Sequence, residues 1–202
     1  MKRTLIVTVA MQVLCASALI AGEPMSAADR DRLIGKLEAS KDALMRSIEG
    51  LDQPQWDYKP DPERWSVAEC LEHIAATEGF ILNLMSDFMA TQTPAQNLTD
   101  DLRKDEIVTS VITDRTSKLK APDPLQPTNR FGDHEGSLAE FHRVRSATIV
   151  LVRDTKDLRS YAGDHPVFGQ MDALGWVLFL SGHSERHTAQ IEEVKAHPLF
   201  PK

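Results

Sequence analysis

The sequence predicts an all-α protein built as a four-helix bundle, and three observations lead to that fold class. Four long segments repeat apolar residues at three- and four-residue steps, which is the period of an amphipathic helix. No segment is convincing as a β-strand. At 202 residues the chain suits one domain that buries a real core. Four amphipathic helices of this length favour a bundle.

The first two helices have clear start signals. We expect the first over about residues 26–50, where Ser26 is a natural N-cap. The second begins at Ser66, because Ser66 and Glu69 form a Ser-x-x-Glu capping box. Between them, the segment 52–64 carries three prolines and cannot be helical for long.

The connection after the second helix, residues 93–136, is long for a compact domain. We expect a short amphipathic helix between Asp100 and Leu119. Its apolar face would consist of Leu102, Ile107, Val111 and Ile112. Three prolines then force extended backbone. A connection of this length is often functional or a crossover.

The third and fourth helices close the chain. Ser137 with Glu140 is a second full capping box and is expected to open the third helix. The residues of that helix expected to face the core are Leu138, Phe141, Val144, Thr148, Leu151 and Val152. After a loop over residues 160–170, Asp172 is expected to cap a fourth helix that runs to about Ala196.

The first 22 residues are typical of an export signal. Lys2 and Arg3 give a basic start, and an apolar run follows over residues 5–21. We therefore expect a signal peptide over residues 1–22, a bundle domain over residues 26–202, and a periplasmic or secreted protein.

Three other interpretations of this N-terminus stay open. A retained membrane anchor is disfavoured because the run is short and interrupted by Gln12. A lipoprotein signal would use Cys15, but bulky Leu14 stands where a small residue is expected. The domain could also start at Met25, which opens a complete bundle.

Composition and charge exclude several function classes. A formal net charge of −7 makes a nucleic-acid partner a poor expectation. The common glycine-rich nucleotide-binding loops are absent from the sequence. With seven histidines and two cysteines, any metal chemistry should rely on imidazoles. We expect a small-molecule substrate and no membrane contact after cleavage, and we leave a homodimer open.

Two histidines share the face of the fourth helix that should be buried. His183 and His187 lie one turn apart on it. The same stripe contains Trp176, Leu180, Ile191 and Val194. Residues four apart on a helix can present two imidazoles to one ion, although hydrogen bonds could equally satisfy each ring.

The remaining histidines have weaker patterns. His73 lies on the shoulder of the second helix's apolar face, where a side chain can lean into the seam between helices or stay half exposed. The four expected at the surface are His134, His142, His165 and His197.

Several segments together resemble the DinB-like family of metal-binding four-helix bundles. The most specific are Gln-Trp-Asp-Tyr-Lys-Pro at residues 55–60, the segment 64–74 that contains Trp-Ser-Val-Ala-Glu, and His-Ser-Glu-Arg-His-Thr-Ala-Gln-Ile at residues 183–191. The proline-rich segment 120–127 is similar to the family's long middle connection. The resemblance extends from Ser26 to the C-terminus.

That resemblance implies a bundle with a non-simple helix order and a long crossover connection between the second and third helices. It also implies one divalent metal, zinc or nickel, held by His73, His183 and His187. Characterised relatives include thiol-dependent transferases and isomerases. Their thiol cofactors are cytosolic, whereas this chain is expected to be exported, so metal-assisted hydrolysis fits no worse. A non-catalytic bundle that binds metal for stability, or another ligand, is the alternative.

Three further residues are candidates for supporting roles. Glu78 on the second helix could hydrogen-bond a histidine. Arg145 could bind an anionic substrate or pair with Glu78, and a snorkelling surface arginine is the interpretation we favour. Cys70 is expected to be a small buried hydrophobe.

Overall fold

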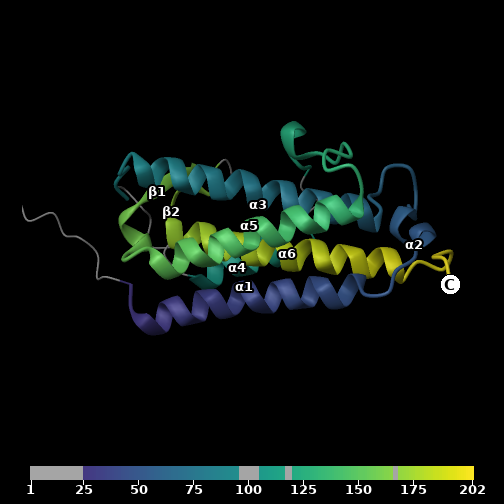
Figure 1. The fold of residues 1–202 in the computed structure, drawn as a ribbon, viewed down its shortest axis with the longest axis horizontal. Coiled ribbons are helices and arrows are strands. Elements are labelled where there is room, and N and C mark those ends of the chain that lie inside the picture. The colour runs from purple at the N-terminus through teal and green to yellow at the C-terminus, as the bar shows by residue number, and fades with distance from the viewer. Residues whose placement is uncertain (1–24, 96–104, 117–119, 166–167) are drawn as a thin grey trace, which may run out of the picture.

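The computed structural model describes residues 25–95, 105–116, 120–165 and 168–202, and it confirms an all-α bundle (Figure 1). Four long helices lie lengthwise along one another: α1 (Ala27–Ile48), α3 (Val67–Ala90), α5 (His134–Asp154) and α6 (Ala173–Lys195). The predicted signal peptide, residues 1–22, lies outside the described residues. None of the described helices combines the length and the apolarity needed to cross a bilayer.

Shorter elements connect these helices. They are α2 (Gln53–Asp57), α4 (Asp105–Thr113), two 3₁₀ turns at Asp123–Leu125 (η1) and Leu158–Ser160 (η2), and strands β1 (Ala162–His165) and β2 (Gly169–Asp172). The two strands form an antiparallel hairpin in which Ala162 faces Asp172.

The order of the helices is not that of a simple up-and-down bundle. Around the bundle, α1 contacts α6, α6 contacts α3, α3 contacts α5, and α5 contacts α1. Two pairs of long helices that follow each other in the chain, α1 with α3 and α5 with α6, are therefore diagonal partners.

Two apolar clusters at opposite ends of the bundle give the helix directions. Leu37 of α1, Met85 of α3 and Val152 of α5 belong to the cluster around Trp176. Leu44, Leu71, Phe141 and Ile191 of the four long helices belong to the cluster around Trp56. Since α3 and α5 both run from the second cluster to the first, they are parallel neighbours. The chain between them must return along the bundle, which confirms the predicted crossover connection.

Most of the predicted helix starts are confirmed by their caps. The Ser26 hydroxyl accepts from the backbone N–H of Asp29 at 3.0 Å. At the start of α3, Ser66 and Glu69 form both halves of the capping box. The Asp172 carboxylate accepts from Gly175 N–H at 2.7 Å, at the start of α6.

Three expectations about the elements were wrong. The third long helix begins at His134 instead of Ser137, because the Asp133 carboxylate caps it by accepting from the N–H of Gly136. The loop over residues 160–170 contains the β1–β2 hairpin, although no strand was expected. In α4, Val108 is buried while Val111 is 46% exposed, so the apolar face includes Val108 in place of Val111. Leu102 lies outside the described residues.

Candidate metal centre

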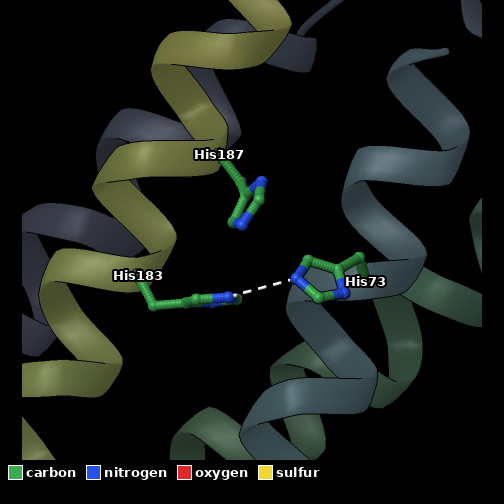
Figure 2. Close-up of side chains that lie close together, drawn as sticks. All are labelled: His73, His183 and His187. Carbon is green, nitrogen blue, oxygen red and sulfur yellow. Dashed lines mark hydrogen bonds between the residues drawn. The ribbon is translucent and has the colours of Figure 1, made fainter. Parts of the chain in front are cut away.

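Three histidines from two helices converge inside the bundle (Figure 2). His73 comes from α3, while His183 and His187 come from successive turns of α6. The Nε2 atoms of His73 and His183 lie 3.1 Å apart. One ring nitrogen from each of the three residues lies within 4.8 Å of the others. The seam between α3 and α6 therefore gathers the three residues that the sequence pattern and the family resemblance single out.

All three rings are buried, with 3%, 6% and 8% of their surface exposed for His73, His183 and His187. Burial lowers the pKa of each imidazole, because a charged ring loses its hydration there. The neighbouring rings lower the pKa of His183 and His187 further. The three rings are thus kept neutral, the protonation state that a metal ligand requires.

Hydrogen bonds fix the orientation of two of the rings. His73 Nδ1 donates to the backbone carbonyl of Leu125 at 2.8 Å. His187 Nδ1 donates to the side-chain oxygen of Gln190 at 2.9 Å. A neutral ring that is protonated at Nδ1 has its lone pair on Nε2. These two bonds therefore leave both Nε2 atoms as unprotonated electron-pair donors.

The crossover connection takes part in the site through that Leu125 carbonyl. Its position is held by Glu72 of α3, whose carboxylate accepts from the backbone N–H groups of Thr128, Asn129 and Arg130. Burial opposes ionisation of Glu72, but these hydrogen bonds outweigh it and keep its pKa below the ordinary value. Neither Leu125 nor Gln190 was expected from the sequence. Gln190 could have been suspected, since it lies three residues after His187 on the same helix.

Aromatic rings enclose the cluster on two sides. The Trp65 indole lies against His73 and His187, with ring centroids 4.7 and 5.8 Å apart. Phe179 stacks on His183 at 5.7 Å. These rings provide an apolar wall next to the three imidazoles.

Glu78 does not contact a histidine, contrary to one expectation. Its carboxylate accepts from Arg145 Nε at 3.0 Å and from the Ser184 hydroxyl at 2.8 Å. Arg145 also donates to the Ser40 hydroxyl at 2.8 Å and to the backbone carbonyl of Leu37. Arg145 is 1% exposed, so the favoured surface interpretation was wrong and the pairing with Glu78 is confirmed. This buried ion pair joins all four long helices.

The other candidates divide between surface and core. His142 is exposed, as expected, and Cys70 is buried, where desolvation raises the pKa of its thiol. His165 was expected at the surface, but it is 8% exposed, because Phe168, Trp176 and Phe179 surround its ring. His134 stacks on Trp56 and is half-buried.

Comparisons with known proteins agree with this fold. A curated protein of Bacillus subtilis (strain 168), YuaE, is 26% identical over 149 residues, which is 73% of this chain and 88% of YuaE. The solved structure of YfiT from Bacillus subtilis, described as a probable metal-dependent hydrolase with an unusual four-helix bundle topology, is 22% identical. That comparison covers 86% of this chain and 90% of YfiT, with a TM-score of 0.59.

The match to a protein family covers most of the chain. Residues 36–191 match the DinB superfamily, a range that includes the three clustered histidines, the buried ion pair and the whole crossover connection. Together with the helix order and the histidine cluster, this match shows that the chain belongs to the DinB superfamily.

Proposed function

We propose that this protein is a metal-dependent hydrolase that holds one divalent ion, zinc or nickel, through His73, His183 and His187. The observation that carries the proposal is the convergence of three buried, neutral imidazoles from α3 and α6 on one point. The description of YfiT as a probable metal-dependent hydrolase supports the same reaction class.

One pair of the donors has the spacing of two ligands on such an ion. Nitrogen ligands lie about 2.0–2.1 Å from zinc, so two ligands of a tetrahedral ion stand about 3.3 Å apart. The Nε2 atoms of His73 and His183 are 3.1 Å apart. In addition, His183 Nδ1 is buried without a hydrogen-bond partner among the described residues.

The number of ligands supports chemistry over a purely structural role. Within the described part of the chain, the group that could hold an ion consists of three histidines, with no fourth histidine, cysteine or carboxylate. Structural zinc sites usually have four protein ligands, whereas catalytic sites have three and leave a position open. The alternative, a bundle that binds metal only for stability, is typically expected to supply a fourth protein ligand.

The chain's own residues then have definite tasks. A divalent ion on three imidazoles supplies Lewis acidity, which polarises a substrate carbonyl and acidifies water. Leu125 and Gln190 hold two of the imidazoles in orientation through their Nδ1 protons. Trp65 and Phe179 lie against the imidazoles and keep bulk water from them.

The decisive experiment is metal analysis of two histidine variants. We expect about one divalent ion per wild-type chain and per His142→Ala chain, because His142 is exposed and outside the cluster. His187→Ala should lose stoichiometric metal yet keep its helical circular dichroism, since α6 retains its apolar stripe. Hydrolysis should then be screened with ester, amide and phosphate substrates on the loaded wild type. Equal metal content in the two variants would contradict the assigned ligands.

A further inference from the structure

Two buried side-chain polar atoms on α3 and α6, the helices that carry the histidine cluster, have no hydrogen-bond partner. They are Thr77 Oγ1 on α3 and His183 Nδ1 on α6, and the only other such atom among the described residues is Trp176 Nε1. Thr77 is 3% exposed and His183 is 6% exposed. A buried hydroxyl or ring nitrogen loses its hydration and is destabilising without a hydrogen-bond partner, so each atom calls for a polar neighbour.

The hydroxyl of Thr77 is unusual within this molecule. Two other threonines buried in long helices, Thr148 and Thr188, donate to the backbone carbonyl four residues earlier, at 3.0 and 2.8 Å. The backbone carbonyl four residues earlier is within reach of any threonine inside a helix. Thr77 does not take it, so its hydroxyl is directed elsewhere.

The helical geometry places Thr77 opposite His183. On α3, His73 contacts His183, and Glu78 contacts Ser184. At 100° per residue, Thr77 projects from α3 between the directions of His73 and Glu78. Because residues on both sides of it touch α6 at positions 183 and 184, Thr77 also faces α6 at that level. The two unpartnered atoms thus belong to facing positions but do not bond each other directly.

We propose that Thr77 is a positioning residue for His183, and that one buried water molecule joins the Thr77 hydroxyl to His183 Nδ1–H. The water accepts a hydrogen bond from Nδ1–H and holds the ring so that its Nε2 lone pair faces the other two histidines. His183 thereby obtains the restraint that Leu125 gives to His73 and Gln190 gives to His187. The inference rests on the proposed function, because it assigns His183 Nε2 to the ion.

The test compares zinc affinity, by competition with a chelator, among the wild type, Thr77→Val, Thr77→Ser and Thr148→Val. Loss of a partner behind a metal ligand typically weakens metal affinity by about 10–100-fold, and we expect that loss in Thr77→Val. Thr77→Ser keeps a hydroxyl and should restore most of the affinity. Thr148→Val makes the same change at a buried position where the hydroxyl only serves its own helix, so its zinc affinity should equal that of the wild type.

Two additional measurements separate positioning from stability. The metal-free Thr77→Val protein should unfold at the wild-type temperature, while the visible absorption of its Co²⁺ form should change. A high-resolution structure of the zinc-loaded wild type should show a water within hydrogen-bond distance of both atoms; a Thr77 hydroxyl bonded to the backbone carbonyl of His73 would overturn the proposal. Wild-type affinity in Thr77→Val would also overturn it, whereas a wild type that binds no zinc would refute the proposed function itself.

Discussion

Desolvation lowers the pKa of the buried histidines His73, His165, His183 and His187, because a charged ring loses its hydration in the interior. His183 and His187 could be identified from the sequence because they repeat on one face of a regular helix. His165 could not, because it follows no helical period and its burial depends on Phe168, Trp176 and Phe179 folding around it. Periodicity predicts burial only within regular elements.

The buried His165 should make stability depend on pH. Desolvation lowers its pKa in the folded protein from 6.5 to about 4. A lowered folded pKa means that the unfolded chain binds the proton first, so stability is complete above about pH 6.5 and falls as the pH drops toward 4. His165→Phe keeps an aromatic ring in the cluster and cannot take up the proton.

We therefore expect the free energy of unfolding of the wild type to fall more steeply with pH than that of His165→Phe. Between pH 7 and pH 4.5 the extra loss should be on the order of 2 kcal/mol. Urea unfolding of both proteins at several pH values measures this extra loss. The contribution of the three clustered histidines to the pH dependence cancels in the comparison, because both proteins retain them. Parallel pH profiles would mean that His165 is already exposed in the native state.

At the scale of single elements, the sequence predicted the long helices well and the irregular segments poorly. Ser66 and Asp172 cap helices as their spacing indicates. At the third helix, both Asp133 and Ser137 have side chains suited to an N-cap, and the structure uses Asp133. The strands were missed because β1 contains no β-branched or bulky aromatic residue. Its Gly163 is required by a tertiary contact, since a Cβ there would lie 2.6 Å from the Phe88 ring.

The ion pair between Glu78 of α3 and Arg145 of α5 also hydrogen-bonds to residues of α1 and α6, and its removal should be costly. An arginine within an apolar stripe can snorkel or pair, and the sequence alone cannot decide between them. Breaking a buried pair leaves an uncompensated charge, so Arg145→Met should lower the free energy of unfolding by about 3–5 kcal/mol. Chemical denaturation followed by circular dichroism measures this loss.

Its control lies two residues earlier on the same helix. Arg143 pairs with Glu140 across one turn, and its side chain is 66% exposed. Arg143→Met should cost less than about 1 kcal/mol, because solvent screens exposed pairs. A double variant, Glu78→Leu with Arg145→Met, should recover much of the stability lost in Arg145→Met, since no unpaired charge remains. A double variant as unstable as the single one would assign the loss to packing instead of charge.

At the scale of the whole molecule, we propose that the protein is exported. The basic start and the apolar run of residues 1–22 support the proposal. Mass spectrometry of the protein from fractionated cells should show a chain that begins near Glu23 in the periplasmic or extracellular fraction. An intact N-terminus on a cytosolic species would contradict the proposed export. A cytosolic protein could also meet the cytosolic thiol cofactors that the related transferases use.

The helix order gives the proposed metal a second consequence. Because α1 and α3 are diagonal in the bundle, each packs mainly against α5 and α6, although only a short connection separates them in the chain. The contact of α3 with α6 lies between elements far apart in sequence. An ion shared by His73 and the α6 histidines would link α3 to α6 and stabilise their packing. A ligand that binds only the folded state stabilises it by about 2.7 kcal/mol at a hundredfold excess over its Kd.

Zinc should therefore raise the unfolding temperature of the wild type and of His142→Ala, and chelator should reverse the rise. His73→Ala breaks the link on the α3 side alone, while α6 keeps both of its histidines. We expect the zinc-dependent rise in Tm to be lost in this variant, although a pair of histidines one turn apart can still bind zinc weakly. Scanning calorimetry with and without zinc gives the comparison directly. A full zinc-dependent rise in His73→Ala would show that the ion is held within α6 and does not connect the two helices.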